Sequence, residues 1–212
     1  MLSPLTRTLL LSLLGAFVLL AVLFQRAQNR KGTTGGRISP PKVAWLFYAV
    51  FLWFIVCPLV ALDAAVSPAA GWVLGLFGAS MWVRGVAEMY MLYVSRNWRP
   101  PYGISHDGLC IVLVLGALAW HRAHWLGPLS PTESWVLALV GLVLVSLVIE
   151  IAYAVLFFQA VQGATTGADG IWFADEEQER FRRINRLTFT FNVPMYGALM
   201  ALLAVDLGLF SR

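Results

Sequence analysis

Six long stretches of the chain are almost entirely apolar, and polar or charged residues separate them. A helix needs about 20 mostly apolar residues to cross a bilayer, because the hydrocarbon core is about 30 Å thick and each residue rises about 1.5 Å. The pattern therefore predicts six membrane-spanning helices. They cover residues 8–24, 43–62, 70–94, 108–127, 134–161 and 187–210.

The connections between these stretches are short and polar. None is long enough to form a domain outside the membrane, so residues 1–212 are expected to form a single transmembrane domain. Because every stretch has the length and composition of a helix, the predicted fold is an all-α, multi-pass membrane bundle.

The basic residues predict the orientation of this bundle. Eleven of the 15 Lys and Arg residues fall in the three linkers 25–42, 95–107 and 162–186. Short loops rich in Lys and Arg remain on the cytoplasmic side of a membrane. These linkers are therefore predicted to be cytoplasmic and both termini non-cytoplasmic. Arg outnumbers Lys by 13 to 2, which favours a GC-rich bacterial genome and hence the bacterial inner membrane.

Composition excludes several classes of protein. The chain is 59% hydrophobic and only 12% charged, whereas soluble domains carry about 25% charged residues. A soluble globular protein and a disordered chain are therefore excluded. The net charge of +4 comes from scattered residues, which excludes a nucleic-acid partner.

Three charged residues fall inside the predicted spans: Arg84, Glu88 and Glu150. A charge near the bilayer centre costs about 2.5 to 3.5 kcal/mol, so each of them needs a partner. Arg84 and Glu88 are four residues apart and share a helix face. Counting the rise per residue places Glu150 at the depth of Arg84. The predicted intramembrane polar cluster is Arg84, Glu88, Ser146, Glu150, Tyr153, Asn192 and Tyr196.

This polar cluster has two interpretations. It carries one positive and two negative groups, so either one carboxyl group is protonated or a bound cation neutralises it. A protonatable carboxyl group at mid-membrane is typical of a proton relay or an ion pathway. The alternative is a structural ion pair that holds the helices together.

Glycines and cysteines add two structural expectations. Gly71, Gly75, Gly78 and Gly85 form a stripe that would allow another helix to approach closely. Cys57 and Cys110 lie at depths that differ by more than a disulfide can bridge, so both are expected to be unpaired.

The histidines are the candidates for a metal or haem site. His121 and His124 are three residues apart at the end of the fourth predicted helix, where both rings could reach one metal ion. Two ligands do not complete a zinc site, and an interfacial role beside Trp120 and Trp125 is the alternative. No cofactor is therefore predicted, while metal or haem stays open. Asp107, just before residue 108, is interpreted as a helix N-cap.

A basic group precedes the last predicted helix. Arg182, Arg183 and Arg186 are positioned to meet anionic lipid headgroups.

The sequence contains no catalytic motif of the usual kinds, which makes an enzyme the less favoured class. The leading hypothesis is a non-catalytic subunit or accessory protein of a larger membrane complex, with other membrane subunits or further copies of the chain as partners. The alternative is a small proton-coupled or ion-coupled carrier or channel that uses the Arg/Glu cluster. The third is a membrane metalloenzyme or haem protein that uses the histidines.

Overall fold

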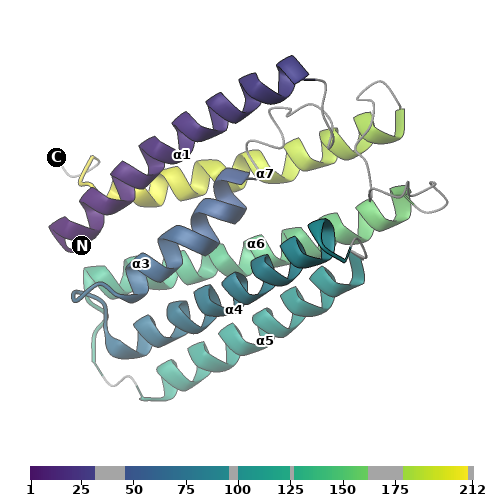
Figure 1. The fold of residues 1–212 in the computed structure, drawn as a ribbon. Helices are drawn as coiled ribbons and strands as arrows, with labels where there is room; N and C mark the ends of the chain where they lie inside the picture. Colours follow the sequence, from purple (N-terminus) through teal and green to yellow (C-terminus); the bar gives the residue numbers. More distant parts are fainter. Residues whose placement is uncertain (32–45, 96–99, 125–126, 162–178, 210–212) are drawn as a thin grey trace.

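The computed structural model describes residues 1–31, 46–95, 100–124, 127–161 and 179–209. Within these residues every regular element is a helix, as predicted (Figure 1). The helices are α1 (Pro4–Lys31), η1 (Leu46–Val56), α3 (Cys57–Ala61), α4 (Pro68–Tyr93), α5 (Pro100–His124), α6 (Pro131–Val161) and α7 (Glu179–Asp206). The π-helix η1 runs directly into α3, so the described residues form six helical rods.

Three of these helices are long and apolar enough to cross a membrane: α4 over Pro68–Met91, α5 over Tyr102–His124 and α6 over Pro131–Leu156. The apolar parts of the other rods are shorter, at 10 to 17 residues. The chain therefore has the helices of a membrane protein.

Prolines, rather than the first apolar residues, mark where several helices begin. α4 begins at Pro68, α5 at Pro100 and α6 at Pro131. Proline suits the first turn of a helix, because the N–H that it lacks has no partner there in any case. α5 therefore begins two turns before residue 108, and Asp107 lies inside it. The interpretation of Asp107 as an N-cap is wrong.

The other bounds also differ from the predicted ones. α1 continues to Lys31, and α7 already begins at Glu179, so part of each predicted linker is helical. Side-chain caps fix two of the starts. Ser67 accepts a hydrogen bond from the N–H of Ala70. Ser130 accepts one from the N–H of Glu133, whose carboxylate in turn accepts from the N–H of Ser130, a capping box.

The rods run roughly side by side (Figure 1). α1, α4 and α6 begin at the end where α3, α5 and α7 finish; we call it the Asp206 end, and the other the Pro100 end. The rod η1–α3 packs extensively on α4, as α5 does on α6, and α6 also packs on α7. The rod η1–α3 also contacts α1, α6 and α7, so it occupies the middle of the bundle.

The predicted glycine stripe of α4 faces this central rod, and the expectation of a close helix contact is confirmed. A Cβ atom on Gly71 would lie 2.9 Å from the carbonyl oxygen of Ala61. One on Gly78 would lie 2.9 Å from Cγ of Pro58, and one on Gly85 2.8 Å from Cε1 of Phe54. The absence of side chains thus allows the two helices to touch.

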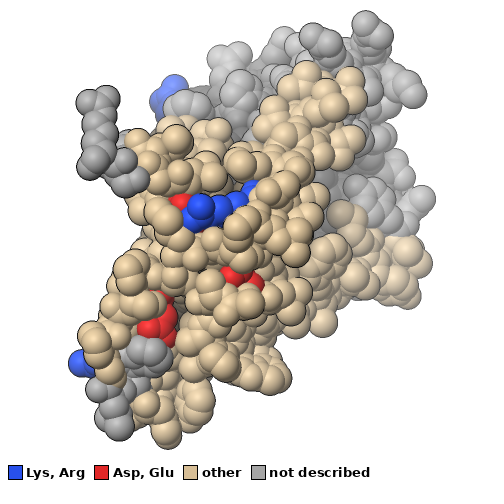
Figure 2. Space-filling model, turned by 90° about the vertical axis from the view of Figure 1, so that its left-hand side faces the viewer, with Lys and Arg blue, Asp and Glu red and all other residues tan. Residues whose placement is uncertain are grey.

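Two buried carboxylates hold the start of α1 at the Asp206 end. Asp63 accepts hydrogen bonds from the N–H and the hydroxyl of Ser3, at 2.9 and 2.7 Å. Asp206 accepts one from the N–H of Leu2 at 2.9 Å and pairs with Nε of Arg7 at 3.1 Å. Seen from this end, charged atoms occupy small patches in an otherwise uncharged surface (Figure 2). Hydrogen bonds and an ion pair to these two carboxylates therefore hold the start of α1 against the bundle, in addition to apolar packing.

Candidate functional site

Arg84 binds a carboxylate on its own helix and a second one on α5, and the second joins α4 to α5. Its Nε donates to Oε1 of Glu88 at 2.9 Å, which confirms the pairing predicted from their spacing. Its Nη1 donates to Oδ1 of Asp107 on the neighbouring helix. The Arg84 side chain is 12% exposed and that of Asp107 1% exposed, so these charges meet inside the bundle.

A glycine on α5 makes room for this guanidinium group. Gly103 lies one turn before Asp107, and a Cβ atom there would come within 3.0 Å of Nη2 of Arg84. Any larger residue would press on the guanidinium group that Asp107 holds.

Trp53 extends the network to α6. Its indole Nε1 donates to the hydroxyl of Ser146 at 2.8 Å, and Ser146 donates to the carbonyl of Val143 at 2.7 Å. Cζ of Arg84 lies 5.8 Å from the centre of the Trp53 ring, within the range of a cation–π contact. One indole on η1 therefore touches both the charged and the neutral parts of the network.

Glu150 adds a third carboxylate. It lies on α6 one turn after Ser146, is 5% exposed, and interacts electrostatically with Arg84. The predicted association of Arg84, Glu88, Ser146 and Glu150 is thus present. With Asp107 included, three carboxylates act on one guanidinium group in the described part of the chain, because Glu88 and Asp107 bond it and Glu150 acts on it electrostatically.

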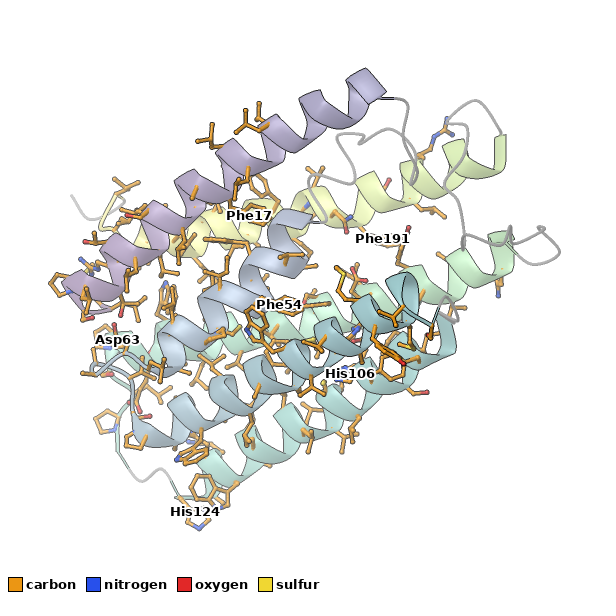
Figure 3. The ribbon with its side chains drawn as sticks, in the orientation of Figure 1. Phe17, Phe54, Asp63, His106, His124 and Phe191 are labelled. Atoms are coloured by element: carbon orange, nitrogen blue, oxygen red, sulfur yellow. The ribbon has the colours of Figure 1, made fainter. Side chains whose placement is uncertain are left out.

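A polar stripe on α5 continues from Asp107. Nδ1 of His106 lies 3.9 Å from Oδ1 of Asp107 and 3.6 Å from Sγ of Cys110. Sγ of Cys110 lies 3.3 Å from the hydroxyl of Ser80 on α4. The rings of Tyr102 and His106 have centroids 6.3 Å apart. Figure 3 shows His106 in the half of the bundle toward the Pro100 end. We call Tyr102, His106 and Cys110 the α5 stripe.

The three remaining members of the predicted cluster occupy different surroundings. Asn192 is 2% exposed on α7, and its Nδ2 has no hydrogen-bond partner among the described residues. Tyr153 is partly buried on α6, whereas Tyr196 is 37% exposed on α7. α7 packs on α6 and η1, so the inward side of Asn192 faces those two elements.

The two histidines proposed as metal ligands lie in unlike environments. His121 is buried, whereas His124 is exposed at the Asp206 end and its Nδ1 is 2.8 Å from the carbonyl of Trp120 (Figure 3). The His124 and Trp120 rings have centroids 4.8 Å apart. In the described part of the chain, no group of three His, Cys, Asp or Glu side chains could hold a metal ion.

The basic group before the last span is described only in part. Arg186 is exposed on α7, as contact with lipid headgroups would require. The side chains of Arg182 and Arg183 lie outside the described residues. Both cysteines are free and buried, as expected.

No family model matches the chain, and no curated protein or solved structure matches it either. The network around Arg84 is therefore the feature of the molecule that bears on its function.

Proposed function

We propose that the protein is a multi-pass membrane protein that conducts protons or small cations through the Arg84 network. All six rods span the bilayer in this proposal, with the Pro100 end on the cytoplasmic side of a bacterial inner membrane. The distribution of basic residues supports this orientation, because 11 of 15 lie in the linkers that join helices at the Pro100 end.

The observation that carries the proposal is the excess of acid around Arg84, with Asp107 and Glu150 buried and Glu88 half-buried. Glu88, Asp107 and Glu150 share one guanidinium group, and Oδ2 of Asp107 accepts no hydrogen bond among the described residues. An uncompensated carboxylate in a low-dielectric interior is costly, so it takes up a proton or a cation. A structural ion pair that only holds the helices together would need one carboxylate to balance the charge of one arginine.

Flux measurements in proteoliposomes test this proposal. Purified protein is reconstituted with a pH-sensitive dye inside the vesicles, and a potassium diffusion potential drives cation entry. We expect the wild-type protein to acidify the lumen, and Asp107→Asn or Glu150→Gln to lower the rate at least tenfold.

Asp63→Asn is the matched control, because it removes a buried carboxylate at the Asp206 end, outside the network. It should leave the flux unchanged. Circular dichroism confirms that each variant is folded. Wild-type flux no faster than in protein-free vesicles, for both protons and sodium ions, would exclude the proposal.

The two other hypotheses have less support. Large apolar side chains such as Trp72 and Trp82 are exposed on α4, but contact with lipid accounts for them as well as a partner subunit does. A metalloenzyme lacks a third ligand beside His121 and His124 among the described residues.

A further inference from the structure

We infer that the conducted ion is the proton, and that His106 passes it between the Pro100 end of the bundle and Asp107. This inference rests on the proposed function; it names the ion and adds a relay residue that the network alone does not require.

The arrangement of oxygens favours a proton over a metal ion. Calcium takes six to eight oxygen ligands, and magnesium takes an octahedron in which one or two carboxylates are joined by several waters. Arg84 already occupies one oxygen of Glu88 and one of Asp107. In the part of the chain that the structure describes, no three ligating side chains come together around an ion. A proton needs only one lone pair, and Oδ2 of Asp107 offers it.

His106 lies between this buried acid and the start of α5 at Pro100. Its side chain is 13% exposed, whereas that of Asp107 is 1% exposed. Tyr102, one turn closer to Pro100, is the next polar member of the α5 stripe. Histidine is the side chain whose ordinary pKa lies nearest to neutral pH, which suits a group that must both accept and release a proton.

The groups around His106 are of both signs. On its own helix it faces Asp107, Cys110 and Tyr102. From α4, Arg84 acts on it electrostatically, and Glu88 is bound to that arginine. From α6, Glu150 reaches the same network through its interaction with Arg84. Protonated His106 is therefore attracted by the acids, above all by Asp107, and is opposed more weakly by Arg84.

The transfer step is a simple proton exchange. Protonated His106 gives the proton from Nδ1 to the Asp107 carboxylate, which leaves a neutral imidazole and a neutral carboxylic acid. Nδ1 lies 3.9 Å from Oδ1 of Asp107, the oxygen that Arg84 holds, so the ring must first rotate to reach Oδ2. Glu88 still holds Arg84 at 2.9 Å while Asp107 is neutral, so the guanidinium group never loses all of its counter-charge. His106 then takes another proton from the Pro100 side.

The test combines substitution with chemical rescue. In the proteoliposome assay, His106→Ala should conduct protons at least tenfold more slowly than wild type, and added imidazole should restore much of the rate. His124→Ala is the matched control, because His124 is exposed at the other end of the same helix. The wild-type rate should change across the range in which histidine titrates, whereas the rate of His106→Ala should not.

Spectroscopy gives a second readout that does not depend on how His106→Ala folds. The chain has three histidines, so replacing His121 and His124 with Gln leaves His106 as the only one. Its ¹⁵N resonances should titrate, and the midpoint should fall in an added Asp107→Asn change.

The possible outcomes separate the two ideas. Unchanged flux in His106→Ala, flux lost without rescue by imidazole, or an unchanged His106 titration in Asp107→Asn would overturn the relay and leave the proposed function standing. Flux of sodium ions in place of protons would overturn the proton assignment and the relay with it, and would leave the proposed function standing. Absence of any wild-type flux would overturn both.

Discussion

At the scale of single residues, Arg84 decides whether the interior of the bundle is stable. Its guanidinium group bonds Glu88 on its own helix and Asp107 on α5, and it lies over the Trp53 ring. Burying an ion pair gains little over an apolar pair of the same size, but removing one partner leaves the other charged and unpaired. Removing Arg84 should therefore lower the stability of the fold by more than the net stabilisation that its own contacts provide.

We expect Arg84→Leu to lower the free energy of unfolding by about 3 to 5 kcal/mol, because it leaves buried carboxylates without their cation. Adding Asp107→Asn should recover part of that loss. Unfolding followed in detergent with increasing denaturant measures both. Arg122→Leu, at an exposed arginine near the end of α5, is the control and should change little. Equal stability of the Arg84 and Arg122 variants would show that the pairing is not stabilising.

The sequence could predict some of these residues but not others. The spacing of Arg84 and Glu88 within one helix was sufficient to predict their pairing. Asp107 was assigned to a helix start because the apolar run begins after it, although Pro100 and Pro101 were the available signal for an earlier start. Trp53 could not be predicted, since an indole in an apolar run shows no sign of which distant hydroxyl its N–H will reach.

At the scale of elements, the contact between α4 and the rod η1–α3 depends on glycine. Gly71 is the most restrictive position, because the atom that a Cβ would meet at 2.9 Å is a backbone oxygen, which cannot rotate away. The spacing of the glycines predicted this stripe, but it could not say which helix would pack against it. Only the fold shows that the neighbour is the central rod.

Gly71→Ala should therefore destabilise the protein by about 1 to 3 kcal/mol through overpacking. Gly116→Ala on α5 is the matched control, since nothing lies within 4 Å of a Cβ atom there. That change should be neutral or slightly stabilising, because alanine favours a helix over glycine. Thermal unfolding of the two variants measures this difference in stability. A Gly71→Ala protein as stable as wild type would mean that α4 and the rod η1–α3 can move apart without loss of stability.

The attachment of α1 should depend on pH through Asp63. Burial raises the pKa of this carboxyl group, but hydrogen bonds from Thr6, from the N–H of Ala65 and from Ser3 outweigh burial and hold it below its ordinary value of 3.8. A group with a lowered folded-state pKa stabilises the fold fully above its unfolded pKa, and loses that contribution as the pH falls through the folded value.

The difference in Tm between wild type and Asp63→Asn should therefore be largest near pH 6 and shrink toward pH 3. Unfolding scans of both proteins across this range measure it. A difference that stays constant with pH would show that the charge of Asp63 does not hold the start of α1.

At the scale of the whole molecule, the proposed orientation can be measured from the two ends. Ser130 is exposed at the Asp206 end and Ser95 at the Pro100 end, whereas Cys57 and Cys110 are buried and should not react. In intact cells, Ser130→Cys should react with a membrane-impermeant maleimide. Ser95→Cys should react only after the cells are opened. The reverse labelling pattern would show that the bundle is inserted the other way round, with His106 near the outer surface of the membrane.

The contacts of Asp206 have a consequence for the order of assembly. This residue binds Leu2 and Arg7, which lie 204 and 199 positions earlier in the chain. At a synthesis rate of about 5 to 20 residues per second, roughly 10 to 40 seconds separate the appearance of the two partners. During that interval α1 is already made, but Arg7 has no carboxylate from α7 to bind. The first helix can pack on the rod η1–α3 as soon as that rod is made, but the Asp206 contacts at its start form only after the last helix, so closure of the bundle is a late event in its biogenesis.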